Sequence, residues 1–168
     1  MIKMIRLDER LIHGQVATKW SRLLDVDRIL VADDEAAENE IVKKSLMMAA
    51  PSDCKTTVVS VDSAIRLCND PRAQQLKILL IVSTPENLLK VTKEVKGIEK
   101  VNIGNYGRIA SKINGQIRDT YTKNLYLYSE EAEILKQVIM TGTDCVVQTI
   151  PDETSRDLSA VLQEKERG

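Results

Sequence analysis

Aromatic side chains are scarce in this chain of 168 residues, at 3% of the total, and phenylalanine is absent. A hydrophobic core must therefore be built from aliphatic side chains. Long apolar runs are also missing. The strongest run, residues 78–82, is far shorter than the roughly 20 residues that a membrane-spanning helix requires. Charged residues interrupt the first ten positions, so the sequence predicts no secretory signal peptide either.

Neither sign of charge dominates, because 24 basic and 25 acidic residues leave a formal net charge of −1. Nucleic-acid binders need a basic face or aromatic stacking platforms, so this class of partner is excluded. Cysteine and histidine are few as well: three cysteines lie far apart, and His13 is the single histidine. This pattern indicates reduced thiols in a cytosolic protein and makes a zinc site improbable.

Short aliphatic strands alternate with amphipathic helices, over a length that suits one domain at residues 1–168. The predicted strands lie at residues 2–6, 28–32, 56–59, 76–82, 99–103, 123–128 and 144–149. The predicted helices lie at residues 14–24, 37–50, after Ser60, at 84–96, 129–141 and near the C-terminus. The alternation predicts a three-layer α/β domain, with a mostly parallel seven-stranded sheet and helices on both faces.

Function in such a sheet gathers at the carboxyl ends of the strands. The candidate loops are therefore residues 7–15, 33–35, 83–86 and 103–107.

The first of these loops carries the most chemistry. His13 stands just ahead of a predicted helix, where free backbone N–H groups and the positive helix end favour an anion. Arg6 and Arg10 are suited to bidentate contacts with a phosphoryl group, and cations beside an imidazole keep it neutral and nucleophilic. Asp8 is an acceptor for an arginine or for the imidazole. The same residues also fit a surface histidine beside two solvated arginines. Further candidate phosphate contacts in and beyond this loop are Gly14, Gln15 and Thr84.

The other loops have simpler explanations. The acidic run Asp33-Asp34-Glu35 resembles a metal-binding pocket, but it follows the second strand, and a helix cap is the favoured interpretation. Thr84 is placed as a helix N-cap that also faces a phosphate at His13. Residues 102–107 lack the lysine of a phosphate-binding P-loop, and a tight turn is favoured over a contact loop.

The run RLDERLIHGQV, followed by Trp20, resembles the active-site signature of the IIB component of the bacterial sugar phosphotransferase system, mannose/sorbose family. The likeness covers nearly the whole chain. It extends through ILVADDEAAENEIVKKSLMMAAP, LLIVSTPENLLKV and VNIGNYG, which are similar to the family's later strands, helices and glycine loop. The chain departs from the family at Asn105-Tyr106-Gly107, which weakens any role for that loop but not for His13.

The resemblance implies a phosphohistidine relay. A IIA component, itself phosphorylated by HPr, would pass its phosphoryl group to His13, with Arg6 and Arg10 as phosphate clamps and Asp8 as an orienting neighbour. His13 would pass it on to a sugar carried by the membrane components IIC and IID. The protein would then be a cytoplasmic phosphotransferase at the membrane transporter. It would need no metal or other cofactor, because phosphohistidine is already an activated donor.

Two other functions stay open at the level of sequence. One is a non-catalytic module of the same fold that binds a phosphorylated ligand reversibly. The other is a receiver-like signalling domain that is phosphorylated on aspartate, which the position of the acidic run disfavours. The sequence also leaves the sugar and the oligomeric state undetermined.

Overall fold

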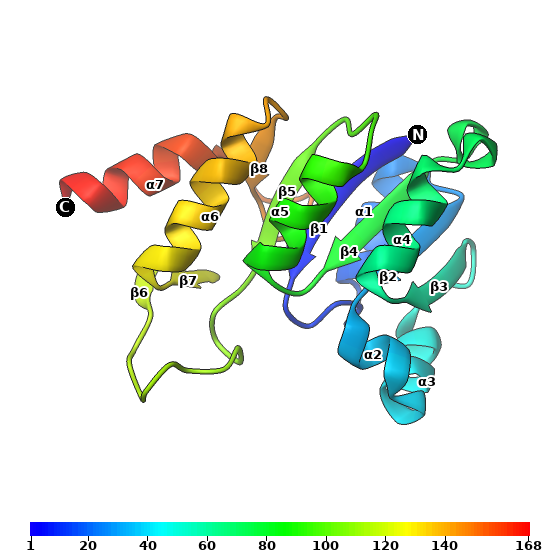
Figure 1. Ribbon diagram of the computed structural model, residues 1–168, viewed down its shortest axis with the longest axis horizontal. Coiled ribbons are helices and arrows are strands. Elements are labelled where there is room, and N and C mark those ends of the chain that lie inside the picture. Colours follow the sequence, from blue (N-terminus) through cyan, green and yellow to red (C-terminus); the bar gives the residue numbers. More distant parts are fainter.

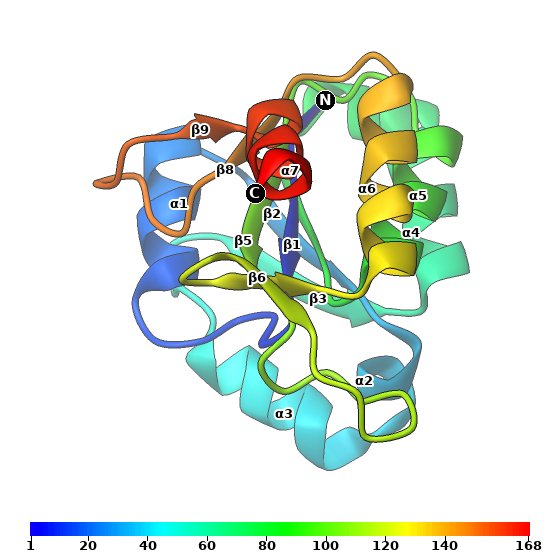
Figure 2. The ribbon, with the colours of Figure 1, turned by 90° about the vertical axis from the view of Figure 1, so that its left-hand side faces the viewer.

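The computed structural model describes residues 1–168. Its main sheet contains β1 (Ile2–Asp8), β2 (Arg28–Ala32), β3 (Lys55–Val59), β4 (Ile78–Val82), β5 (Val101–Asn105), β8 (Cys145–Val147) and β9 (Arg156–Asp157). These strands are arranged in the order β3-β2-β4-β1-β5-β8-β9. Figure 1 shows this order from β3 to β8, and Figure 2 shows β9 beside β8. All neighbours are parallel except β8 and β9. The predicted fold class, a mostly parallel sheet of seven strands, is confirmed.

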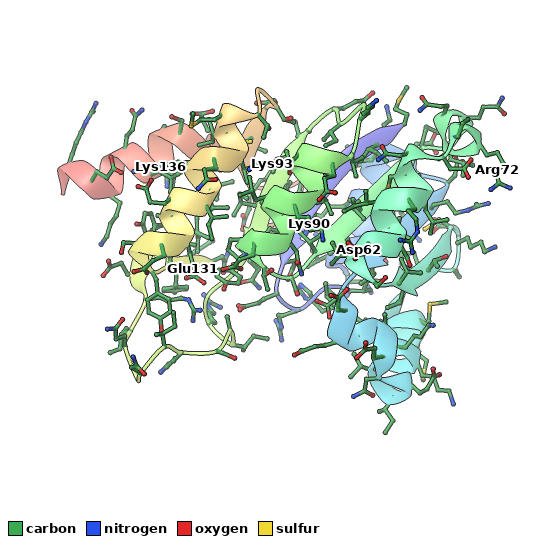
Figure 3. All side chains as sticks on the ribbon, viewed as in Figure 1. Asp62, Arg72, Lys90, Lys93, Glu131 and Lys136 are labelled. Carbon is green, nitrogen blue, oxygen red and sulfur yellow. The ribbon has the colours of Figure 1, made fainter.

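Helices cover both faces of this sheet. They are α1 (Val16–Leu24), α2 (Asp34–Glu38), α3 (Glu40–Ala49), α4 (Val61–Asn69), α5 (Pro85–Glu94), α6 (Ser129–Met140) and α7 (Leu158–Arg167), with a short 3-10 helix η1 (Pro71–Gln75). Figure 2 shows α4, α5 and α6 on one face and α1 on the other. Lys90 of α5 pairs with Asp62 of α4 at 2.8 Å (Figure 3). None of these helices combines the length and the apolar character needed to span a bilayer.

Two aliphatic core clusters result, one on each face. The larger contains 29 buried residues, on the side of α4, α5 and α6. The smaller contains 13, among them Trp20 of α1. The helices begin where local capping signals predict: Ser60 accepts the N–H of Ser63, and Thr84 accepts the N–H of Asn87. Core burial and caps therefore support the same helix positions.

The predicted strand at residues 123–128 is wrong in its placement. Its central part is β7 (Leu125–Leu127), which forms a separate antiparallel pair with β6 (Asp119–Thr122). The seventh place in the main sheet belongs to β9, a two-residue strand whose residues are exposed. Neither β6 nor β9 shows the apolar alternation of a half-buried strand, so neither could be predicted from hydrophobic periodicity.

The predicted helix at residues 37–50 is divided. Asn39 has an extended backbone, and its side-chain oxygen accepts the N–H groups of Ile41 and Val42, which starts α3 separately from α2. Both helices lie at the carboxyl edge of the sheet, below β2 and β3 in Figure 1. They therefore form part of the wall around the first candidate loop.

Candidate active site

The loop after β1 lies at the centre of the sheet, because β1 pairs with β4 on one side and β5 on the other. These strands are parallel, so their carboxyl ends open on one edge, where α/β proteins bind ligands. The loop is anchored by its apolar residues: Leu11 and Ile12 are buried in the same core cluster as Trp20. Its polar side chains are left to form the site.

Asp8 is the centre of the polar contacts. Its side chain is fully buried, and Oδ2 lies 3.0 Å from Nη2 of Arg6 and 2.9 Å from Nε2 of His13. Its Oδ1 accepts the backbone N–H of Arg10 at 3.0 Å. One carboxylate thus links three of the residues that the sequence singles out. Because Nε2 of His13 faces Asp8, Nδ1 is the ring nitrogen left for chemistry.

Arg6 is not the exposed phosphate clamp expected from the sequence, because only 2% of its side chain is accessible. Its Nη1 donates to Oδ1 of Asn102 at 2.5 Å and to the carbonyl of Gln148 at 3.3 Å. Its guanidinium also lies 5.6 Å from the ring centroid of Trp20. Burial lowers the pKa of Arg6 from its usual value, and Asp8 opposes that effect. Arg6 therefore reaches His13 only through Asp8.

His13 itself is partly exposed, with 21% of its side chain accessible. It precedes the N-terminus of α1, where Gln15 occupies the N-cap position without a side-chain cap and no acidic residue lies in the first turn. Every other α-helix has a side-chain cap or an acidic first turn. The positive end of α1 is therefore left uncompensated beside the imidazole.

Arg10 is exposed and lines an open groove of about 800 Å³ together with His13. It is the cation of the first loop that faces this groove. Gly14 and Gln15 are exposed as well, and Gly14 has a left-handed backbone with φ of 49°. The structure thus brings His13 and Arg10 together, with Gly14 and Gln15 next to them in the chain.

The acidic run borders the groove but is used for capping. Asp33 accepts the N–H of Ala36 and the hydroxyl of Ser83, and Asp34 accepts the N–H of Val61. The interpretation as a helix cap is confirmed. Thr84 caps α5 and lines a neighbouring groove without His13, whereas Ser83 lines the groove that contains His13. Ser83 was not among the candidate residues expected from the sequence, although it lies in the candidate loop 83–86.

Comparison with known proteins connects this arrangement to one family. The model of the "PTS system sorbose subfamily IIB component" matches residues 2–168. The chain belongs to this family of phosphotransferase-system IIB components. It is 38% identical to a probable phosphotransferase enzyme IIB component of Streptococcus pyogenes, over 96% of this chain and 99% of that one. It is 30% identical to the sorbose-specific EIIB component of Lacticaseibacillus casei, over 98% and 96% of the two chains.

Solved structures agree with the sequence comparison. The IIB domain of the sorbose permease from Klebsiella pneumoniae has a TM-score of 0.87 and 25% identity, covering 98% of this chain and 97% of that one. Like its relatives, this IIB component is an enzyme component of the phosphotransferase system and a member of the mannose/sorbose group.

The segment 102–107 of this IIB component differs from the predicted turn. Residues Val101–Asn105 form β5, and only the positions after them leave the sheet. A Cβ atom at Gly104 would lie 2.3 Å from Cζ of Arg6, so the missing side chain makes room for the guanidinium. Asn102 holds the same guanidinium. The space at Gly104 and the hydrogen bond to Asn102 together position the Arg6 guanidinium. The sequence positions of Gly104 and Asn102 do not indicate this role.

Glu9 is a second residue that the sequence analysis missed. Its carboxylate accepts the backbone N–H groups of four consecutive residues, Gly107 to Ala110, at 3.0–3.3 Å. It thereby ties the loop after β5 to the loop that carries His13. An exposed-looking acid in a charged run gives no sequence signal for this contact.

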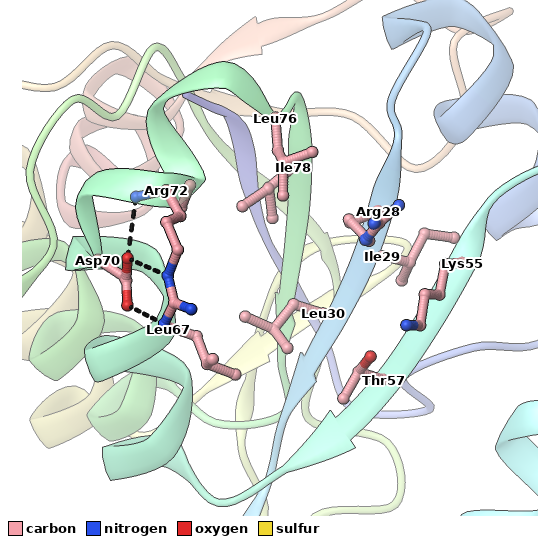
Figure 4. Close-up of a pocket in the computed structure, with 11 residues that line it drawn as sticks. Arg28, Ile29, Leu30, Lys55, Thr57, Leu67, Asp70, Arg72, Leu76 and Ile78 are labelled. Atoms are coloured by element: carbon pink, nitrogen blue, oxygen red, sulfur yellow. Dashed lines mark hydrogen bonds and ion pairs between the residues drawn. The ribbon is translucent and has the colours of Figure 1, made fainter.

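A smaller cavity of about 230 Å³ lies away from His13, beside the amino-terminal ends of β2 and β3 (Figure 4). Leu30, Leu67 and Ile78 are among its apolar lining residues, and Arg72 at its rim is paired with Asp70. This cavity is lined by neither histidine nor cysteine, and its one carboxylate, Asp70, is engaged by Arg72. The groove at His13 is therefore the candidate active site of the IIB component.

Proposed function

We propose that His13 is the phosphoryl carrier of this IIB component. Its Nδ1 attacks the phosphorus of a phosphohistidine on a IIA component. The P–N bond of the donor breaks, and a P–Nδ1 bond forms on His13. In the second step a sugar hydroxyl attacks the same phosphorus, the P–Nδ1 bond breaks and returns its electron pair to Nδ1, and the hydroxyl proton passes to solvent water as the sugar phosphate forms.

The observation that carries this proposal is the position of the imidazole between a buried carboxylate and an open helix end. Asp8 lies 2.9 Å from Nε2, which favours the tautomer with its proton on Nε2 and a lone pair on Nδ1. The phosphoryl oxygens would lie towards the N-terminus of α1, where the helix dipole and free N–H groups stabilise negative charge. Phosphoryl transfer depends mainly on such positioning and charge neutralisation.

The other site residues receive separate roles in this proposal. Arg10 contacts the phosphoryl oxygens from the groove, and Gly14 and Gln15 contribute backbone N–H groups. Arg6 acts through Asp8, whose orientation it holds. A contact of Thr84 with the phosphoryl group stays a prediction, and its use as a cap of α5 gives that contact no support.

Membership of the family implies the partners. The donor is a IIA component, the acceptor is a sugar bound by the membrane components IIC and IID, and the chain works at the cytoplasmic side of that transporter. The receiver-like alternative loses support, because Asp33 and Asp34 are engaged in hydrogen bonds at helix N-termini.

The test is to incubate the chain with phosphorylated IIA component and to map the modified residue by mass spectrometry under non-acidic conditions. We expect a single phosphoryl group on His13 and none on a His13→Ala variant. Normal labelling of His13→Ala would refute the proposal. Reversible binding of phosphate without covalent labelling would identify the binding-module alternative instead.

Arg10→Ala tests the clamp. Loss of one charge-assisted contact with the transferring group costs about 2–4 kcal/mol, or a factor of roughly 10²–10³ in rate. The free energy of unfolding should stay within about 0.5 kcal/mol, because Arg10 is exposed. Arg10→Lys should recover part of the rate, since lysine lacks the planar fork. A normal transfer rate in Arg10→Ala would remove Arg10 from the site.

A further inference from the structure

The segment 107–117, here called the anchored loop, contains no helix or strand, yet its backbone is held at several points. At its start, the carboxylate of Glu9 accepts four consecutive backbone N–H groups. In its middle, the hydroxyl of Tyr128 accepts the N–H of Ile113 and donates to the carbonyl of Gln116. A loop with this many contacts is preorganised, so little conformational freedom is lost when a partner binds it.

The end of the anchored loop is held by a buried cation. Arg118 donates to the carbonyls of Ala110 and Ser111 at 3.1 and 2.9 Å, and its guanidinium lies 4.3 Å from the ring centroid of Tyr128. Its Nε pairs with Glu131 at 2.8 Å. Figure 3 shows Glu131 in the first turn of α6, at the end of the helix nearest to the anchored loop.

The anchored loop exposes three isoleucines among polar side chains that include Arg108 and Lys112. Ile109, Ile113 and Ile117 are 69%, 53% and 83% exposed. Isoleucine side chains held in water by a rigid backbone mark an interaction surface, because covering them is favourable and costs little ordering. Ile109 also lines the groove that contains His13, together with Val42 and Leu46 of α3. The anchored loop and α3 therefore both contribute apolar side chains to the groove that contains the imidazole.

Charge narrows the kind of partner. The anchored loop carries the cations Arg108 and Lys112, and α3 carries Lys43 and Lys44, none of which lines the groove. Apart from Arg10 and His13, the charged side chains that line the groove itself are acids, namely Asp33, Glu35 and Glu38, while Glu9 is occupied by backbone amides. An anionic lipid surface is repelled by such a groove. A protein with an apolar patch bordered by basic side chains is complementary to it.

We propose that the anchored loop and α3 form the docking surface for the phosphoryl-donor protein, and that Glu9 is the positioning residue that sets the loop in place. The proposal rests on the proposed function, since a donor must reach His13 through the groove that both elements line. It adds the residues that recognise the donor and the chemistry of the donor's surface. Glu9 does not touch the reacting atoms and acts through the position of the loop.

The first experiment measures docking without transfer. A ¹⁵N-labelled His13→Ala chain is titrated with unphosphorylated IIA component. We expect shifts or broadening at residues 107–117 and in α3. Ile109→Ser combined with Ile113→Ser should weaken binding about tenfold, as for loss of about 1.4 kcal/mol at an interface. Met140→Ser, which changes an 83% exposed side chain at the far end of α6, is the matched control and should bind normally.

The second experiment tests Glu9. In Glu9→Gln, one acceptor oxygen becomes an NH₂ group that cannot accept, so the amide signals of residues 107–110 should move. With phosphorylated IIA component as substrate, KM should rise about tenfold while kcat stays within about twofold. Glu94→Gln, an exposed acid on α5, is the control. The double isoleucine variant should show the same KM effect with an intact loop.

Three outcomes would overturn the docking proposal: unchanged binding of the double isoleucine variant, shifts confined to other elements such as α7, or a kcat loss with unchanged KM in Glu9→Gln. Failure of the proposed function looks different. In that case the wild-type chain is not phosphorylated on His13, whereas the titration with unphosphorylated IIA component still reports whether and where this partner docks.

Discussion

At the scale of single residues, the site depends on a buried pair that prepares an exposed group. Arg6 and Asp8 are both inaccessible, and their contact at 3.0 Å is supported by Asn102 and by the open space above Gly104. Breaking such a pair leaves a buried charge without a partner, which is strongly destabilising. The pair also orients His13, because the Asp8 carboxylate that Arg6 holds in place contacts the imidazole ring.

Gly104→Ala tests this dependence. The new methyl group would overlap the Arg6 guanidinium and push it away from Asp8. We expect a loss of about 1–3 kcal/mol in the free energy of unfolding, typical of overpacking, and slower phosphorylation of His13. Urea denaturation and the phosphorylation rate measure the two effects. Gly168→Ala at the C-terminus, where the added atom meets only ordinary contacts, should change neither quantity. A fully active, equally stable Gly104→Ala chain would contradict the role given to Arg6.

At the scale of elements, helix ends decide what each loop does. The start of α6 is closed: Glu131 accepts the N–H of Tyr128, the hydroxyl of Tyr106 and the guanidinium of Arg118. The start of α1 is open, with neither a side-chain cap nor an acidic first turn. The closed end fixes the anchored loop, and the open end is left for an anion beside His13.

Glu131→Gln should therefore destabilise the chain, by about 3–5 kcal/mol, because Arg118 would be left buried without its counter-charge. Burial raises the pKa of Glu131, but the bonds from Arg118 and Tyr106 outweigh it, and the pKa lies below the usual 4.5. Its stabilising effect is thus complete above about pH 4.5 and is lost as pH falls through the lowered pKa. Denaturation between pH 3 and 7 should show a smaller acid loss in Glu131→Gln than in wild type. Equal acid sensitivity would show that other carboxylates are responsible.

At the scale of the whole molecule, the two faces of the sheet differ in the size and composition of their buried cores. The side of α4, α5 and α6 holds the larger aliphatic core, including Cys68 and Cys145. The opposite side holds Trp20, which lies against Arg6 and donates to the carbonyl of Thr149. Most of the buried core thus lies on one face, and the loop that carries His13 emerges at the carboxyl edge of the sheet.

The buried thiols predict a loss of stability at high pH. Burial raises the pKa of Cys68 to about 11 and that of Cys145 to about 12, from 9.0 in an exposed thiol. Above pH 9 the unfolded chain loses these protons first, so the free energy of unfolding falls as pH rises. Urea denaturation from pH 7.5 to 10 should show a shallower fall in the Cys68→Ala, Cys145→Ala double variant. Identical slopes in the two proteins would assign the fall to other groups.

Much of the fold followed from local signals. Aliphatic runs located β2 and β4, because strands buried on both faces are continuous apolar runs. The β-branched residues of TTVV located β3. Ser60 and Thr84 located the starts of α4 and α5, because a cap acts within its own turn. The position of His13 after the first strand and before the first helix was predictable for the same reason: it depends only on neighbours in the chain.

Contacts between residues that are far apart in the sequence were decided only by the tertiary structure. Arg6 is close to Asn102, and Glu9 to residues 107–110, across separations of 96 to 101 positions that no periodicity reports. The exposed strand β9 is a strand only because β8 offers it a free edge. The sequence therefore determined the positions of β1 to β5 and of most helices between them. Which arginine is buried, which acid holds a loop and which strand closes the sheet depended on the packing of distant segments.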